Sequence, residues 1–311
     1  MPPPPESVTL RTVAPAKINW TLEVLRRRPD GYHEIRSIMQ TISLADGLEL
    51  WPARSEVLTV DGIGVDTLST ADNLVLRAAR SFPERSGESC VAFHLSKQIP
   101  TAAGLGGGSS DAAAALRLLR RLWPIDASVN LFTVATALGS DTPFFLKGGA
   151  QLAEGRGELL TPLPANEPVS LILATPPISL PDKTARLYAQ LRPDHYSDGA
   201  AAARLAAKLR AGRSPNREDC FNVFDQVADR VFSDLTEYRR TFERITGLEP
   251  CLAGAGPSLF GVCASSTDEQ ASAESIAVLE REGFRAWFVH TVGADAATRI
   301  DVERRPARFA P

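Results

Sequence analysis

The chain of 311 residues is longer than one ordinary folding unit and predicts two domains of about 150 residues each. Its hydrophobic fraction of 44% and charged fraction of 23% are those of an average globular protein, which excludes a largely disordered, collagen-like or membrane-embedded chain. A formal net charge of -3 offers no long-range attraction for a nucleic-acid backbone, so we expect no nucleic-acid partner.

The four cysteines, Cys90, Cys220, Cys251 and Cys263, include no C-x-x-C pair. They predict reduced core thiols rather than a zinc site or a disulfide framework. The N-terminal Met-Pro-Pro-Pro-Pro-Glu lacks the basic and apolar blocks of a signal peptide, and no apolar run reaches about 18 residues. We therefore expect a cytoplasmic protein with no membrane partner.

The first part of the chain predicts mainly antiparallel sheet. Apolar and polar residues alternate over 18–24, as in a half-buried strand that ends at the turn 28–31. Segments 38–44 and 48–51 flank Asp46-Gly47, a favoured hairpin pair, so we predict a hairpin turn there. Asp72-Asn73 is expected to cap a helix through about residue 82, and 91–95 alternates as another strand.

From residue 99 onward the predicted order is loop and helix. One helix is expected to end near 123, and a second spans about 128–138 and stops at Gly139. Prolines between 162 and 168 predict a boundary, with one domain over 1–164 and another over 165–311. Beyond it we predict strands at 169–174, 258–263 and 286–292 and helices near 183–190, 200–211, 222–246 and 269–282. The fold class is therefore α+β.

Glycine is concentrated between Gly104 and Ser110, directly before a predicted helix. Glycines let the backbone turn its amide groups inward, and a helix N-terminus adds partial positive charge, so the two together bind phosphate. Ser109-Ser110-Asp111 stands where a P-loop requires lysine, and the glycine spacing fits a dinucleotide fingerprint poorly. The loop predicts a site for the phosphates of ATP; the alternative is a flexible connector between strand and helix.

Two further residues suit phosphoryl transfer to an alcohol, which needs a group that accepts the hydroxyl proton and a cation that tempers the charge. Asp141 follows a helix stop, and Lys17 lies on the polar face of a predicted strand. Taken singly, each also fits an ordinary structural role, the aspartate in an Asx turn and the lysine as a solvated side chain.

Three segments favour the catalytic interpretation over the structural one. Residues 15–19, 99–111 and 252–258 resemble, in order, the three motifs of the GHMP kinase superfamily. Within it, Arg28-Pro-Asp-Gly-Tyr-His-Glu34 and Leu138-Gly-Ser-Asp-Thr-Pro-Phe144 resemble the segments particular to the 4-diphosphocytidyl-2-C-methyl-D-erythritol kinase family. This resemblance implies a two-domain fold. The N-terminal, ATP-binding domain would be ribosomal protein S5 domain 2-like, the C-terminal domain would be ferredoxin-like, and the active site would lie in the cleft between them.

The resemblance also implies a reaction, the ATP-dependent phosphorylation of a 2-hydroxyl in the non-mevalonate isoprenoid pathway. ATP is the implied co-substrate, and Mg²⁺ is expected to arrive with it, because the sequence shows no carboxylate cluster that could cage a metal. Two alternatives remain open. One is another GHMP small-molecule kinase, of the mevalonate or homoserine type, and the other is a non-catalytic ligand-sensing member. A monomer or a weak homodimer is expected.

Carried over by position, the resemblance makes Asp141 the base and Lys17 the cation beside it. Tyr32 would stack on the cytosine and His33 would hydrogen-bond its edge. The implied substrate-binding residues are Asn19, Tyr32, His33, Thr184 and Tyr188. The implied ATP-binding residues are Asn73, Lys97, Pro100, Ala102, Ala103, Gly104, Leu105, Gly106, Gly107, Gly108, Ser109 and Ser110.

The third motif departs from the family pattern but keeps its glycines, Gly254 and Gly256. Ala253 and Ala255 stand where the family often has serine, which removes two hydroxyls and leaves the backbone amides. Trp20 is larger than the aliphatic residue common after the first motif. We expect the role of the third motif to be carried by its backbone.

Overall fold

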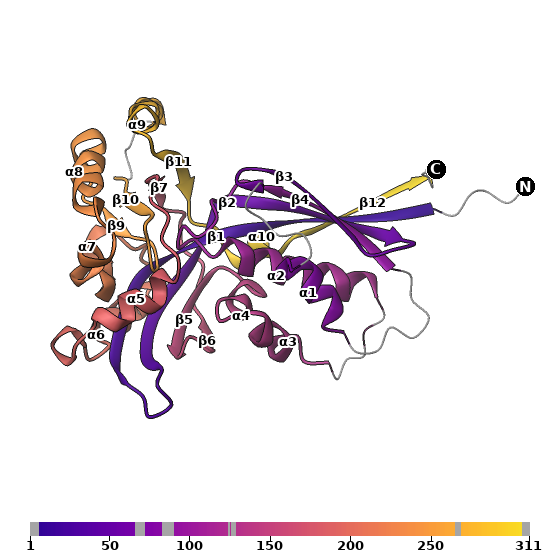
Figure 1. The fold of residues 1–311 in the computed structure, drawn as a ribbon, viewed down its shortest axis with the longest axis horizontal. Coiled ribbons are helices and arrows are strands. Elements are labelled where there is room, and N and C mark those ends of the chain that lie inside the picture. Colours follow the sequence, from indigo (N-terminus) through magenta and orange to yellow (C-terminus); the bar gives the residue numbers. More distant parts are fainter. Residues whose placement is uncertain are drawn as a thin grey trace, which may run out of the picture.

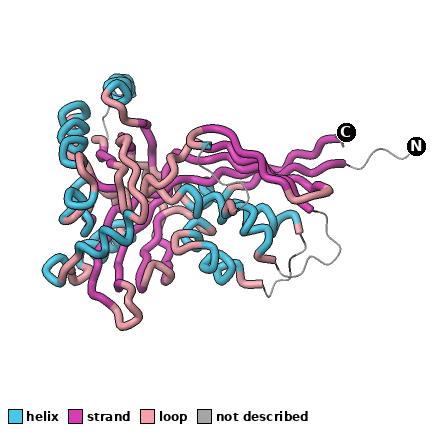
Figure 2. The backbone as a smooth tube through the Cα atoms, viewed as in Figure 1, coloured by secondary structure: helices cyan, strands magenta, loops and turns pink. Residues whose placement is uncertain are grey.

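The computed structural model describes residues 6–65, 72–82, 90–123, 125, 129–264 and 269–306. The N-terminal proline run and the predicted start of a helix at 128 lie outside these residues. Two sheets organise the described chain, with helices on their outer faces (Figures 1 and 2). No helix in the described ranges is both long and apolar enough to cross a membrane.

The larger sheet has the strand order β12-β1-β2-β4-β3, with β5 and β8 pairing on β2 and β1 and β6 pairing on β5. Its strands are β1 (Glu6–Arg27), β2 (His33–Ala53), β3 (Val57–Gly62), β4 (Cys90–Lys97), β5 (Ala150–Gly155), β6 (Leu159–Pro162), β8 (Phe221–Asn222) and β12 (Ile300–Pro306). The helices α1 (Leu74–Arg80) and α2 (Gly107–Leu122) pack on one face, where Leu76 and Leu116 share a core with Phe93. Two short helices follow α2, namely α3 (Leu131–Leu138) and α4 (Thr142–Phe145).

The smaller sheet is antiparallel throughout, in the order β11-β7-β10-β9. Its strands are β7 (Ser170–Thr175), β9 (Cys251–Leu252), β10 (Leu259–Val262) and β11 (Arg285–His290). The helices of this part are α5 (Lys183–Gln190), α6 (Ala200–Arg210), α7 (Ala228–Val231), α8 (Leu235–Thr246), α9 (Glu269–Arg281) and α10 (Ala294–Thr298). Alternate residues of β7 face opposite ways: Ile172 joins Phe242 of α8, whereas Leu173 shares a core with Ile18 of β1.

The two sheets therefore share a hydrophobic core. Trp20 of β1 is completely buried and meets Phe260 of β10 edge to face, with ring centroids 5.9 Å apart. The large side chain at this position thus fills the space between the sheets. The 164/165 boundary stays a prediction. After residue 165 the chain returns twice to the larger sheet, since β8 and β12 both pair with β1.

Several local predictions are confirmed. The turn 28–31 joins β1 to β2, with Gly31 at a φ of 85° and the amide of Arg28 donating to the carbonyl of Tyr32. Asn73 caps α1 by accepting a hydrogen bond from the amide of Val75. Helix α5 spans the predicted residues.

The predicted hairpin turn at Asp46-Gly47 is wrong. Strand β2 runs straight through this pair, with Asp46 opposite Ala14 and Gly47 opposite Val13. The Asp46 side chain is fully buried and accepts hydrogen bonds from Lys97 Nζ and from the amides of residues 98 and 99. These tertiary partners outweigh the turn preference of the dipeptide.

The single helix predicted over 222–246 is also wrong. Residues Phe221 and Asn222 form β8, and the helical part is divided into α7 and α8. Asn222 Nδ2 donates to the carbonyls of Leu252 and Gly254. This residue therefore ties the third glycine motif to β1, a tertiary role that helical periodicity does not reveal.

Candidate active site

A cavity of about 1750 Å³ is lined by residues from both parts of the chain. Most of the predicted site residues line it: Lys17, Asn19, Tyr32, His33, Asn73, Lys97, Pro100, Ala102, Ala103, Gly104, Gly106, Gly107, Gly108, Ser109, Asp141, Thr184, Tyr188 and Gly254. Leu105, Ser110 and Gly256 lie outside its lining. The structure thus brings together segments that are more than 200 residues apart in the sequence.

Lys17 and Asp141 meet in this cavity. Lys17 Nζ lies 3.8 Å from Asp141 Oδ2 and donates a 2.7 Å hydrogen bond to Asn19 Oδ1. Asn19 in turn donates to Ser37 Oγ at 2.7 Å, and Ser37 donates to the carbonyl of Thr21 at 2.6 Å. This chain of hydrogen bonds fixes the ammonium group in one position at the buried end of the cavity.

The two charged groups differ in their exposure to solvent. The Lys17 side chain is 6% exposed and that of Asp141 is 41% exposed. Burial lowers the pKa of Lys17, and the nearby Asp141 carboxylate opposes this shift. Asp141 occupies the N-cap position of α4, but its side chain caps no amide among the described residues. The carboxylate is therefore open to the cavity, whereas the Asx-turn alternative would have occupied it.

The two glycine-rich segments pack against each other beside Lys17. Gly104 and Gly106 have φ values of 84° and 76°, and Gly106 is the N-cap of α2. A Cβ at Gly104 would lie 2.4 Å from the carbonyl oxygen of Ala253. A Cβ at Gly254 would lie 2.8 Å from Lys17 Nζ. Glycine at these positions permits the close approach of both backbones to the lysine and leaves the start of α2 facing the cavity.

Lys97 lies deeper, between two buried carboxylates. Its Nζ donates to Asp46 and, at 2.7 Å, to Asp111 Oδ2. Burial raises the pKa of Asp111 to about 8; Lys97 opposes that shift and Asp46 adds to it. Because Lys97 donates to both Asp46 and Asp111, it keeps fewer free donors for a ligand than Lys17 does. The sequence pattern singled out Lys97 and missed the contacts of both aspartates, although Asp111 falls within the second glycine motif.

An aromatic wall closes the opposite side. His33 stacks on Tyr188 with ring centroids 4.7 Å apart and an interplanar angle of 15°, and Tyr188 meets Phe224 edge to face at 5.0 Å. Tyr32 is 58% exposed and lies under the guanidinium group of Arg156, 4.8 Å from the ring centroid. His33 and Tyr188, predicted from distant segments, are therefore in direct contact. Sequence reasoning missed Phe224 and Arg156.

Two serines, Ser109 and Ser110, stand at the end of the glycine loop. No group of three or more histidine, cysteine or acidic side chains among the described residues could hold a metal ion. Ser109 lines the cavity, whereas Ser110 Oγ is buried and has no hydrogen-bond partner in the described part of the chain. Mg²⁺ commonly keeps its waters and the oxygens of a bound nucleotide, with few protein ligands. Of the two serines, only Ser109 lines the cavity.

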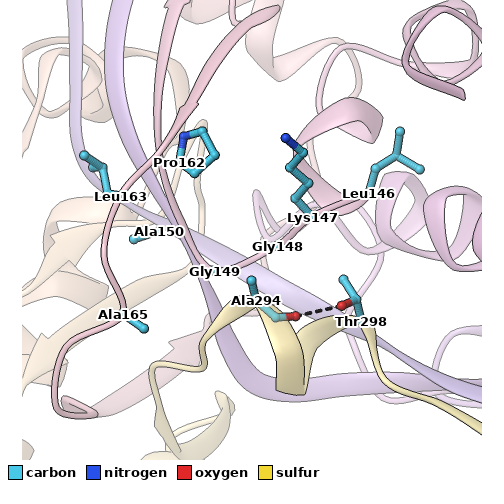
Figure 3. Close-up of a pocket in the computed structure, with 10 residues that line it drawn as sticks. All are labelled: Leu146, Lys147, Gly148, Gly149, Ala150, Pro162, Leu163, Ala165, Ala294 and Thr298. Atoms are coloured by element: carbon cyan, nitrogen blue, oxygen red, sulfur yellow. Dashed lines mark hydrogen bonds between the residues drawn. The ribbon is translucent and has the colours of Figure 1, made fainter. Parts of the chain in front are cut away.

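A second, smaller cavity of about 320 Å³ lies where the end of α4 meets β6 and α10 (Figure 3). Lys147 is its only ionisable lining residue, and Thr298 Oγ1 donates to the carbonyl of Ala294 within α10. None of the predicted site residues lines this cavity.

Comparisons with known proteins agree with this arrangement. The model of the GHMP kinases N terminal domain matches residues 73–149. The 4-diphosphocytidyl-2-C-methyl-D-erythritol kinase of Dehalococcoides mccartyi (strain CBDB1) is 39% identical over 287 residues, which cover 91% of this chain and 99% of that protein. The enzyme of the same name from Symbiobacterium thermophilum is also 39% identical, covering 89% and 98% of the two chains.

Solved structures give the same result. A crystal structure of 4-(cytidine 5'-diphospho)-2C-methyl-D-erythritol kinase superposes with a TM-score of 0.75 at 35% identity, covering 91% of this chain and 99% of that one. A homoserine kinase from Cytophaga hutchinsonii, 16% identical with a TM-score of 0.63, shares the fold. The predicted α+β GHMP kinase fold is confirmed. The chain belongs to the 4-diphosphocytidyl-2-C-methyl-D-erythritol kinase family of GHMP kinases.

Proposed function

We propose that this chain transfers the γ-phosphoryl group of ATP to the 2-hydroxyl of 4-diphosphocytidyl-2-C-methyl-D-erythritol, with Asp141 as the base and Lys17 as the neighbouring cation. The observation that supports these roles is the 3.8 Å approach of Lys17 Nζ to Asp141 Oδ2 beside both glycine motifs. The family relationship supports the reaction and the use of ATP.

The proposed step is an in-line displacement. The 2-hydroxyl oxygen bonds to the γ-phosphorus, the bond from that phosphorus to the bridging oxygen breaks, and ADP leaves with the electron pair. The hydroxyl proton passes to the Asp141 carboxylate, which is open to the cavity. Lys17, held by Asn19, stabilises the negative charge on the phosphoryl oxygens. Mg²⁺ bound with ATP would neutralise phosphate charge.

The remaining predicted residues divide the cavity between the two substrates. The backbone of 104–108 and the start of α2 are placed to hold the ATP phosphates. On the far wall, the stacked His33 and Tyr188 offer flat surfaces and a ring nitrogen to the cytosine, and Thr184 lies on the same helix as Tyr188. The exposed ring of Tyr32, which has the Arg156 guanidinium over one face, would offer its other face to the base.

Substrate-dependent ADP release tests this proposal. The purified protein with Mg-ATP should release one ADP for each molecule of the cytidine diphosphate substrate consumed, and mevalonate and homoserine should give no release above background. His33→Ala should raise KM for the cytidine substrate at least tenfold while KM for ATP changes less than twofold. Turnover of mevalonate or homoserine alone would instead identify another GHMP kinase, and absence of any turnover would favour a ligand-sensing role.

A further inference from the structure

Lys183 bridges the two glycine motifs from the other side of the cavity. It is the first residue of α5, and it lines the cavity together with Lys17 and Asp141. Its Nζ donates a 2.6 Å hydrogen bond to the carbonyl of Ala102 and a second hydrogen bond to the carbonyl of Gly256. One side chain from the C-terminal part of the chain thus contacts both loops that flank Lys17.

The Lys183 ammonium contacts neutral groups rather than anions in the part of the chain that the structure describes. Among the described residues, no carboxylate forms an ion pair with it, and its only hydrogen-bond acceptors are the two neutral carbonyls. Burial, together with the positive charge of Lys17, lowers its pKa to about 7. Buried cations are costly unless an anion compensates them, so an anion bound beside Lys17 would gain from both ammonium groups.

The backbone conformation around Lys183 supports a functional role for its contact with the two glycine motifs. Ala102 and Asp182 adopt φ values of 53° and 52°, in the left-handed region that non-glycine residues rarely occupy. Ala102 provides one of the two carbonyls, and Asp182 is the residue directly before Lys183. Such backbone strain is concentrated at functional sites, where the surrounding structure maintains it.

We propose that Lys183 is a second phosphate-binding cation of this site, which exchanges the carbonyls of Ala102 and Gly256 for oxygens of the γ-phosphoryl group during its transfer. This inference rests on the proposed function. An ammonium group offers three donors and a full charge, so it can bind an oxygen of the transferring group while Lys17 binds another. Lys183 would then act on the phosphoryl group present in ATP and absent from ADP.

The γ-phosphoryl group is preferred to the diphosphate of the cytidine substrate for a geometric reason. Both carbonyls that hold Lys183 belong to the glycine motifs, and Ala102 itself is one of the predicted ATP-binding residues, two positions before Gly104. The aromatic part of the substrate wall, Tyr188 stacked on His33 of β2, lies further along α5 than Lys183 does.

The test compares Lys183→Met and Lys183→Arg with the wild-type chain. Lys147→Met serves as the control, because Lys147 is exposed and does not line the active-site cavity. We expect Lys183→Met to lower kcat by about 10²-fold, as the loss of one charged donor to a transition state does. It should also weaken binding of a non-hydrolysable ATP analogue at least tenfold while ADP binding changes less than twofold. Lys183→Arg should restore part of kcat, and Lys147→Met should match the wild type.

Two results would overturn the inference. An effect confined to KM for the cytidine substrate would assign Lys183 to the substrate diphosphate. Equal weakening of ADP and of the ATP analogue, together with a lower Tm, would make it a structural link between the loops. The binding comparison needs no turnover, so it remains informative if the wild-type chain fails to phosphorylate the cytidine substrate, which would count against the proposed function instead.

Discussion

Lys17 and Lys97 are both buried lysines of the same cavity, but their surroundings differ. Lys17 keeps more free donors for a bound ligand than Lys97 does. Lys17 contacts a neutral amide and a partly exposed carboxylate, whereas Lys97 is enclosed by Asp46 and Asp111. The sequence motifs identify both lysines correctly as cavity residues. They predict a different role for each lysine but do not reveal the carboxylates around Lys97, because Asp46 comes from a strand 51 residues away.

The buried cluster around Lys97 makes stability depend on pH. The pKa of Asp111 rises from an ordinary value of 3.8 to about 8 in the folded chain, chiefly because of burial. The folded state therefore holds a proton that the unfolded state releases above about pH 4. The stability from this proton is fully present below that pH and is lost as the pH rises towards 8.

We therefore expect the free energy of unfolding of the wild-type chain to fall relative to that of Asp111→Asn between pH 5 and 8, by up to about 1.4 kcal/mol per pH unit. Above pH 8 the difference should level off. Urea unfolding at a series of pH values measures it. Parallel pH curves for the two proteins would show that Asp111 is already ionised at pH 5.

At the scale of elements, sequence patterns located most helices and strands but failed where a side chain has a distant partner. Asp46-Gly47 has the composition of a turn, yet β2 continues because Asp46 accepts hydrogen bonds from the start of the glycine loop. Asn222 similarly begins a strand rather than a helix, since its amide holds the third glycine motif. Asp46 and Asn222, the two residues whose local pattern gave a wrong prediction, thus both hold segments of the candidate site in place.

The glycine loop predicts a contrast between two substitutions. Gly104→Ala would combine a φ of 84° with a Cβ 2.4 Å from the Ala253 carbonyl, so we expect a loss of more than about 2 kcal/mol in the free energy of unfolding. Gly108→Ala is the matched control, because its Cβ would lie 3.5 Å from Leu74 Cδ1 within the first turn of α2. It should be neutral or stabilise by up to about 1 kcal/mol.

Urea unfolding of both variants without ligand checks this contrast. Equal stability of the two proteins would mean that the loop relaxes easily and that its glycines are not required for the packing of the two motifs.

At the scale of the whole molecule, the chain on the two sides of the predicted 164/165 boundary is joined by strand pairing and core packing as well as by the backbone. The edge strand β12 pairs with β1 close to the N-terminal end of the described chain, as Figure 1 shows, and Trp20 packs on Phe260 between the sheets. The short strand β12 carried no signal that sequence analysis used, because its place depends on an edge of β1 that is formed far away in the sequence.

Because strands from beyond residue 164 complete the larger sheet, we predict that residues 1–164 do not fold alone. The fragment lacks β8 and β12, both partners of β1, and it would expose Trp20 to water. We expect it to show no cooperative thermal transition, whereas the full chain should show one. A cooperative transition in the fragment would establish an independent N-terminal domain with the predicted boundary.

The proposed phosphoryl transfer depends on one carboxylate, that of Asp141. Asp141→Asn keeps the shape of the side chain but removes the group that accepts the hydroxyl proton, so kcat for phosphorylation of the cytidine substrate should fall by 10²-fold to 10⁴-fold, roughly the contribution of a general base. Binding of ADP should stay within about twofold of wild type, because the glycine loop is untouched. Single-turnover phosphorylation with the cytidine substrate and Mg-ATP measures this directly. A variant that transfers the phosphoryl group at near wild-type rate would contradict the assignment of Asp141 as the base.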